Sequence, residues 1–187
     1  MSLVRGLSIF GLCFAFVVIA LGAWTRLVDA GLGCPDWPGC YGFVVFPTTE
    51  AEILIAEQRY PQFPYEIDKA IPEVVHRYFA AALGFIAILL VAFSYKHKLP
   101  TRIKAIASFL LFFICCQGLF GYLTVSMKLL PIIVTGHLFG GFITLSLFFY
   151  LFLNTSDGIK NHQIGHLKTL GGIALFALLI QIFLGAW

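Results

Sequence analysis

Residues 132–153, IIVTGHLFGGFITLSLFFYLFL, decide the fold class of this chain. The stretch contains no Asp, Glu, Lys or Arg. A helix of about 20 apolar residues is long enough to cross the hydrocarbon core of a bilayer. The stretch therefore predicts a transmembrane helix, with one histidine, His137, inside it.

Four further stretches share this apolar character, at residues 7–24, 74–95, 105–125 and 170–187. Over all 187 residues, 60% are hydrophobic and only 11% are charged. A soluble domain of this size could not cover so much apolar surface with so few charges. The sequence predicts an all-α membrane protein, namely a four-helix transmembrane bundle followed by a fifth span.

A short internal repeat links the first and the fifth spans. VIALGAW at 18–24 and QIFLGAW at 181–187 agree at five of seven positions. We interpret residues 1–169 as a first four-helix unit, ending in a cytoplasmic tail loop at 154–169, and residues 170–187 as the first span of an incomplete second repeat. The alternative is a chance match, because Trp is enriched at membrane interfaces.

The distribution of charge predicts how the chain crosses the membrane. Basic residues crowd the connection between the second and third spans: Lys96, Lys98, Arg102 and Lys104. Because cytoplasmic loops carry the excess of Lys and Arg, we expect this side and the N-terminus to be cytoplasmic. The long loop at 25–73 then lies outside, where eight acidic residues face three basic ones. No basic stripe indicates nucleic-acid binding.

The N-terminal segment favours a bacterial inner (plasma) membrane. No Arg- and Ser-rich transit peptide precedes the first span, and bulky Trp24 ends it where a cleaved signal peptide would have small residues.

In the outer loop, Thr49-x-x-Glu52 predicts a capping box that opens a short helix, Glu50–Gln58. Pro72 is expected to be the first residue of the second span, where its missing N–H costs nothing.

Two histidines lie within the predicted spans, and ionisable groups inside a membrane tend to mark function. His76 and His137 lie near the outer ends of the second and fourth spans, so both can lie at one depth. Small residues follow each histidine on its own helical face: Ala80, Gly84, Gly140 and Gly141. Such faces can leave a slot for a flat macrocycle with an imidazole ligand on each side. Helix packing is the alternative, and zinc is disfavoured because no third ligand accompanies the pair.

The other histidines have a simpler interpretation. His97, His162 and His166 fall in cytoplasmic connections, where solvated or lipid-facing side chains are typical. Gln117, in the third span, is more typical of a contact between helices than of a pocket.

Two charged residues flank His76. Glu73 can orient a ligand, move protons or stabilise positive charge on a substrate, or it can simply complement the helix dipole. Arg77 can pair with an acidic ligand group such as a propionate, or extend to the interface.

The outer loop contains CPDWPGC, residues 34–40. Cys34 and Cys40 face the oxidising side, and their short spacing permits a disulfide. Metal binding would need more ligands nearby. A disulfide here would shape a lid or accept electrons, because closing so short a loop adds little global stability. The other three cysteines lie in spans, where a small apolar thiol is the usual interpretation.

Four ordered motifs together resemble the haem A synthase family. They are GAWTRLVDAGLGCPDWPGCYG at 22–42, Glu-x-x-His-Arg at 73–77, QGLFGYLTV at 117–125 and TGHLFGG at 135–141. The resemblance covers nearly the whole chain. It implies an oxidoreductase that converts haem O to haem A, by oxidising a porphyrin methyl group to a formyl group for terminal oxidases.

The resemblance also implies roles for individual residues. His76 and His137 match the histidine pair that holds the haem O substrate through its iron, and Arg77 is expected beside the same haem. Glu73 matches the acid regarded as catalytic, which would stabilise a cationic intermediate or take up a proton as water attacks. Cys34 and Cys40 match a pair that shapes the outer loop or relays electrons.

The family's pattern extends beyond this sequence. A second half should supply another histidine pair for a haem b, so this chain is expected to be a fragment or to need a partner with the missing spans. Implied partners are haem O synthase, the cytochrome oxidase assembly machinery, an electron acceptor and membrane lipid; a homo-oligomer is also compatible. Two other functions stay open: a bis-histidine electron-transfer module, and an assembly factor without catalysis.

Overall fold

The computed structural model describes residues 1–156 and 165–186, and its secondary structure is helical. The elements in chain order are α1 (Ser2–Leu27), α2 (Glu50–Arg59), α3 (Ile67–Lys96), α4 (Thr101–Ser126), α5 (Pro131–Thr155) and α6 (Gly165–Ala186). Between the described residues, β-pairing is limited to one isolated bridge joining Cys40 and Phe43. The predicted all-α class is confirmed.

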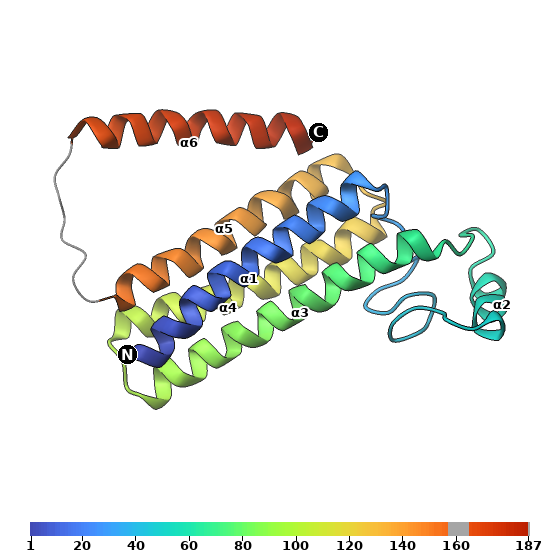
Figure 1. The fold of residues 1–187 in the computed structure, drawn as a ribbon, viewed down its shortest axis with the longest axis horizontal. Helices are drawn as coiled ribbons and strands as arrows, with labels where there is room; N and C mark the ends of the chain where they lie inside the picture. Colours follow the sequence, from blue (N-terminus) through green and yellow to red (C-terminus); the bar gives the residue numbers. More distant parts are fainter. Residues whose placement is uncertain (157–164, 187) are drawn as a thin grey trace.

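Four helices, α1, α3, α4 and α5, are long and apolar enough to cross a membrane. The first four predicted spans all lie inside these helices, which run one to seven residues further at each end. The chain is a multi-pass membrane protein. The N-terminus and the α3–α4 turn lie at one end of the bundle, and the long loop containing α2 lies at the other (Figure 1).

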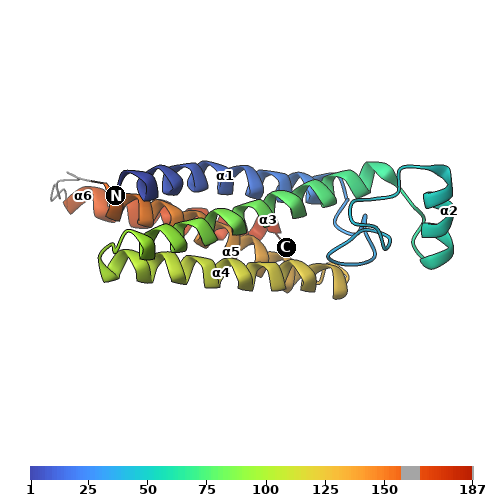
Figure 2. The same cartoon turned by 90° about the horizontal axis from the view of Figure 1, so that it is seen from below.

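The four long helices form a closed ring. Helix α1 packs against α3 and α5, and α4 packs against the same two helices. Helices α3 and α5 therefore face each other diagonally across the interior, with α1 and α4 between them (Figure 2). Each of these diagonal helices carries one of the two histidines that the sequence singles out.

The start of the second span differs from the prediction. Helix α3 begins at Ile67, so Pro72 lies inside the helix and not at its first position. The additional turn is polar: Asp68 is an acid in the first turn, and the Lys69 ammonium pairs with Glu66 at 3.0 Å. Because charged residues can be helical outside the bilayer, apolar length located the span but not the beginning of its helix.

The short helix of the outer loop follows the prediction closely. The Thr49 hydroxyl accepts the Glu52 N–H at 3.3 Å, and the Glu52 carboxylate accepts the Thr49 N–H at 3.0 Å. This reciprocal capping box starts α2 at Glu50, as expected. The helix ends at Arg59, one residue beyond the predicted end.

The half of the bundle that contains the N-terminus, which we call the inner half, is held by apolar packing. Its buried cluster includes Val4, Leu83, Ile86, Leu90, Ile103, Leu110, Phe148 and Leu151. Phe148 is fully buried, and its ring occupies the space where a side chain at Gly11 would lie. The close approach of α5 to α1 therefore depends on that glycine.

Helix α6 corresponds to the predicted fifth span. Of the described helices it contacts α5 alone, and its side chains from 169 to 185 are exposed apart from half-buried Ile182. The end of the expected span, Trp187, lies outside the described residues, as do His162 and the side chain of His166. The division into a first unit and the beginning of a second stays a prediction.

Candidate functional site

His76 and His137 face each other across the bundle interior. The centroids of the two imidazole rings are 6.5 Å apart, and the ring planes are nearly perpendicular at 84°. His76 comes from α3 and His137 from α5, the two diagonal helices. The structure thus brings together two side chains that are 61 positions apart in the sequence.

The hydrogen bond of His76 defines its tautomer. Its Nδ1 lies 3.1 Å from the backbone carbonyl of Val18 on α1. A carbonyl oxygen can only accept, so Nδ1 carries a proton, and in the neutral imidazole Nε2 then keeps its lone pair. Histidines that bind metals commonly have this arrangement, in which one ring nitrogen is fixed by a carbonyl and the other is free to coordinate.

The hydrogen bonding of His137 differs from that of His76. Its Nδ1 is buried and, within the described part of the chain, has no hydrogen-bond partner. A buried polar atom without a partner costs free energy and calls for an explanation. Gly121 on α4 lies beside this ring, where an added Cβ would come within 3.7 Å of Cε1.

The two imidazoles fit a haem iron. Bonds of about 2 Å from each ring to one metal would put the ring centroids on the order of 6 Å apart, close to the observed separation. Among the described residues, no cluster of three or more histidines, cysteines and carboxylates forms a metal site. The donor set is therefore two neutral imidazoles on opposite sides of the interior, as in bis-histidine haem proteins.

The small-residue faces near the histidines are occupied by side chains. The Gln117 amide occupies the position that a Cβ at Gly140 would take. Ile114 lies 3.7 Å from the corresponding position at Gly84, and Ile19 lies 3.4 Å from that at Gly141. The expected slot is thus filled by side chains from α1 and α4. A flat ligand needs these side chains to move.

Glu73 is buried and connects the outer loop to α3. Only 5% of its surface is exposed. Its Oε2 accepts the backbone N–H of Cys34 at 2.8 Å, and its Oε1 accepts from Nη2 of Arg77 one turn later. Both carboxylate oxygens therefore have partners, and one partner belongs to the disulfide loop.

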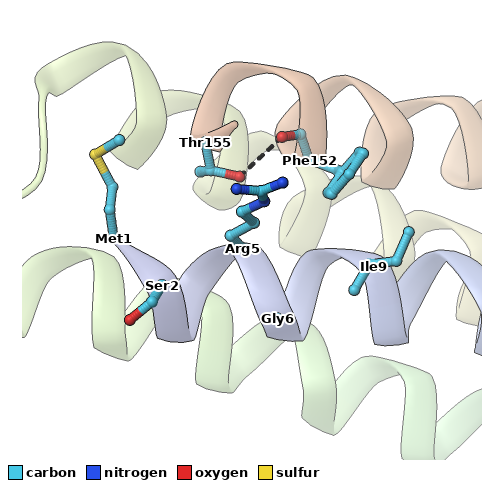
Figure 3. Close-up of a pocket in the computed structure, with 7 residues that line it drawn as sticks. All are labelled: Met1, Ser2, Arg5, Gly6, Ile9, Phe152 and Thr155. Atoms are coloured by element: carbon cyan, nitrogen blue, oxygen red, sulfur yellow. Dashed lines mark hydrogen bonds between the residues drawn. The ribbon is translucent and has the colours of Figure 1, made fainter. Parts of the chain in front are cut away.

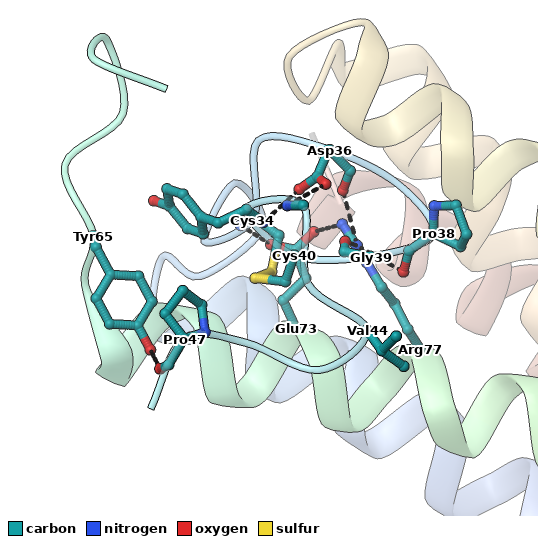
Figure 4. Close-up of a disulfide and its surroundings, with 12 residues drawn as sticks. Cys34, Asp36, Pro38, Gly39, Cys40, Val44, Pro47, Tyr65, Glu73 and Arg77 are labelled. Carbon is teal, nitrogen blue, oxygen red and sulfur yellow. Dashed lines mark hydrogen bonds and ion pairs between the residues drawn. A yellow bond between two sulfur atoms is a disulfide. The ribbon is translucent and has the colours of Figure 1, made fainter. Parts of the chain in front are cut away.

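Arg77 holds the same loop through its other terminal nitrogen (Figure 4). Its Nη1 donates to the Gly39 carbonyl at 2.6 Å and to the Asp36 carbonyl at 2.9 Å, with the Pro38 carbonyl at 3.4 Å. The planar guanidinium suits this task because its N–H groups diverge in a fixed plane. In this structure Arg77 is bound to loop carbonyls and to Glu73.

Cys34 and Cys40 form a disulfide, with an S–S distance of 2.08 Å and Cα atoms 4.8 Å apart. Both cysteines are completely buried. Inside the loop, the Asp36 carboxylate accepts the N–H groups of Tyr41 and Gly42, at 2.6 and 2.8 Å. We define residues 34–42 as the disulfide loop; it is held by its own hydrogen bonds as well as by α3.

An aromatic cluster supports the outer side of this loop. Tyr41 is 2% exposed, its hydroxyl donates to the Pro64 carbonyl at 3.0 Å, and its ring meets Tyr60 and Tyr65 edge to face. Burial raises the pKa of Tyr41 to about 12, and nearby carboxylates, Glu66 foremost, act in the same direction. The loop is therefore adapted to a neutral phenol at this position.

Two cavities lie away from the histidine pair. One of about 400 Å³ lies at the opposite end of the bundle, between the start of α1 and the end of α5 (Figure 3). Its lining includes Arg5, whose guanidinium lies over the Phe152 ring at 5.7 Å. A second cavity, of about 200 Å³, lies in the outer loop beside Tyr41 and Lys69. The candidate site is defined here by its donor atoms.

Sequence reasoning missed several residues at this site. The Val18 carbonyl and Gly22, both on α1, contact His76, and Asp36 organises the disulfide loop. Asp36 had a detectable signal, because aspartate in a tight turn commonly accepts nearby backbone N–H groups. The α1 contacts had none, since they depend on which helices become neighbours.

The fold and the site together define a class: a multi-pass helical membrane protein with two facing histidines beneath a disulfide-closed outer loop. The model of the COX15-CtaA family, described as cytochrome oxidase assembly protein, matches residues 5–187, and the chain belongs to this family. A curated relative, the haem A synthase of Shewanella oneidensis, is 41% identical over 179 residues, which cover 94% of this chain and 54% of the relative. The chain thus spans about half the length of that relative. No solved structure matched it.

Proposed function

We propose that this chain binds haem O between α3 and α5 and takes part in its oxidation to haem A. The observation that carries the proposal is the pair of facing imidazoles, 6.5 Å apart, in a member of this family. His76 and His137 would hold the haem iron from opposite sides. The 41% identity to a haem A synthase supports the choice of substrate.

The proposed orientation follows the charges at the two ends of the bundle. The α3–α4 turn, which is rich in lysine and arginine, lies at the same end as the N-terminus (Figure 1). We assign this end to the cytoplasm of a bacterial cell, and the disulfide loop to the outer face, where oxidation of thiols is favoured.

The proposed reaction needs an electron acceptor and a proton acceptor. Turning a methyl group into a formyl group with water removes four electrons and four protons and adds one oxygen atom. The electrons must pass to an acceptor outside this chain. Haem O synthase would supply the substrate, and the oxidase assembly machinery would receive the product.

Glu73 is proposed to position the site as well as to assist catalysis. Its carboxylate is bound by Cys34 N–H and Arg77, one turn before His76. Each carboxylate oxygen keeps a second lone pair, but the side chain is only 5% exposed, so an attacking water would first have to reach it. We therefore assign Glu73 first to holding the disulfide loop over the haem, and second to stabilising positive charge that develops on the substrate.

The hydrogen bonds of Glu73 favour a second possible function. A bis-histidine module that carries electrons without changing its haem needs the histidine pair but no free carboxylate. The use of both Glu73 oxygens to bind Cys34 N–H and Arg77, as a structural anchor for the loop, suits such a module. Haem b bound by a second histidine pair, and any homo-oligomer, remain proposals that concern more than the described residues.

One experiment separates the two functions. Cells that make haem O are given the chain, and their haems are extracted and separated by chromatography. Haem A is expected with the chain, and its loss on Glu73→Gln with haem still bound would support catalysis by Glu73. The matched control is Glu66→Gln, an exposed acid near the start of α3. Bound haem O without any haem A would contradict synthase activity of this chain and favour the electron-transfer module.

A further inference from the structure

Helix α1 presents a gap in its side-chain surface directly opposite His76. An added Cβ at Gly22 would lie 2.9 Å from Cε1 of His76, 3.3 Å from Nε2 and 3.4 Å from Nδ1. The first of these distances is shorter than real Cβ atoms show, so no residue other than glycine fits unless the ring moves. The imidazole thus packs directly on the backbone of α1.

The same gap exposes the carbonyl that binds His76. In an α-helix the Val18 carbonyl accepts the N–H of Gly22, four residues later, and keeps a second lone pair. A helical side chain covers the turn on the N-terminal side of its own Cα. A side chain at position 22 would therefore cover the Val18 carbonyl, to which Nδ1 of His76 binds at 3.1 Å.

We propose that Gly22 and the Val18 carbonyl form a positioning device that holds His76 as its Nδ1–H tautomer, with Nε2 available to a ligand. This inference deepens the proposed haem site and rests on it only for the identity of the ligand. Gly22 is a positioning residue, since it acts through His76. It also gives a structural role to the first LGAW motif, whose glycine is Gly22.

The glycines of the bundle differ in a way that isolates this effect. At Gly121, beside His137, an added Cβ would make an ordinary contact of 3.7 Å with the ring. At Gly6, on the same helix as Gly22, an added Cβ would meet nothing within 4 Å. Replacing Gly6 or Gly22 by alanine brings the same gain in helix propensity, about 1 kcal/mol. Gly6→Ala is therefore the matched control for Gly22→Ala.

The test is ¹⁵N NMR of the haem-free chain labelled at histidine, with the His76 signal assigned from a His76→Gln variant. The wild-type chain should show a protonated Nδ1, and so should Gly6→Ala. Gly22→Ala should lose this tautomer while keeping its helical circular dichroism and its disulfide. An Nε2–H tautomer in the wild type would overturn the proposal without any variant, and so would an unchanged tautomer in Gly22→Ala.

A second readout uses haem added to the purified proteins. Loss of an outer contact to a metal ligand typically weakens binding 10- to 100-fold, so we expect at least about a tenfold loss for Gly22→Ala and a shifted absorption band of the bound haem. Gly6→Ala should bind as the wild type does. If no protein binds haem but the tautomer changes as described, the haem assignment fails and the positioning device stands.

Discussion

The two ends of helix α3 have different surroundings. Its inner part buries Leu83, Ile86 and Leu90 in an apolar cluster. Its outer part buries Glu73 and encloses His76, with polar partners drawn from α1 and from the disulfide loop. The inner part needs only size and shape from its neighbours, whereas each outer side chain needs a particular atom at hydrogen-bond distance.

This difference predicts two kinds of mutational effect. Changes in the inner part should lower stability and leave the site chemistry intact, because apolar packing is non-directional. Changes in the outer part should alter ligand binding or loop attachment even where the bundle stays folded. Four predictions follow this division.

The largest expected effect is on haem binding. His76→Ala and His137→Ala should each abolish the spectrum of a haem with two histidine ligands, because the remaining imidazole cannot fill both axial positions. The measurement is the absorption spectrum of purified protein after haem is added. His97→Ala, in the exposed α3–α4 turn, is the control and should leave the spectrum unchanged. Retention of the six-coordinate spectrum in either histidine variant would contradict the site.

The next effect belongs to the apolar cluster in which the inner part of α3 is buried, and concerns Phe148 of α5. Phe148→Ala should lower the free energy of unfolding by about 3–5 kcal/mol, because it leaves a cavity against Gly11 where a fully buried ring had packed. Its neighbour Phe149 is 48% exposed, so Phe149→Ala should cost far less. Unfolding in mixed detergent measures both. An altered haem spectrum in folded Phe148→Ala would mean that the apolar cluster and the histidine site are not independent.

A third prediction compares two ion pairs on α3. Arg77→Ala leaves the Glu73 charge buried and deprives the disulfide loop of its donor, at a cost of about 3 kcal/mol. Lys69→Ala breaks the Glu66 pair at the surface, where solvent screens the charges, and should cost far less. Limited proteolysis of the outer loop should accelerate in the first variant only. Equal protease resistance in the two variants would show that Arg77 does not hold the loop.

The smallest effect concerns pH. Burial raises the pKa of Tyr41 to about 12, against about 10 for a tyrosine in an unfolded chain. The neutral phenol is thus favoured by folding. Its stabilisation is fully present below about pH 10 and is lost as pH rises towards 12, at up to about 1.4 kcal/mol per pH unit. Tyrosinate absorbance during alkaline titration should show a late step that Tyr41→Phe removes; an unchanged titration would refute the assignment.

The fold was largely predictable from the sequence because each main feature had a local signal. Apolar length located the four spans, and Thr49-x-x-Glu52 located α2. The shared depth of His76 and His137 followed from counting crossings. Pro72 misled the prediction of where α3 begins, because polar residues before it continue the helix outside the apolar stretch.

The partners in the site could not be predicted in the same way. Glu73 binds Cys34, 39 positions away, and His76 binds the backbone of Val18, 58 positions away. A backbone carbonyl has no signature in a sequence, and a glycine that admits a ring looks like any other glycine. These contacts appear only after α1 and α3 have been placed side by side.

The closed ring of helices affects how a large ligand can enter the interior of the bundle. The interior ends, on the outer side, beneath a loop whose Trp37 ring meets Tyr122 of α4 edge to face, 5.9 Å away. If haem binds between α3 and α5 as we propose, this arrangement favours its entry from the lipid, through a seam between two neighbouring helices. Exchange would then depend on how readily two helices part within the bilayer, and membrane thickness and fluidity would set its rate more than aqueous concentration does.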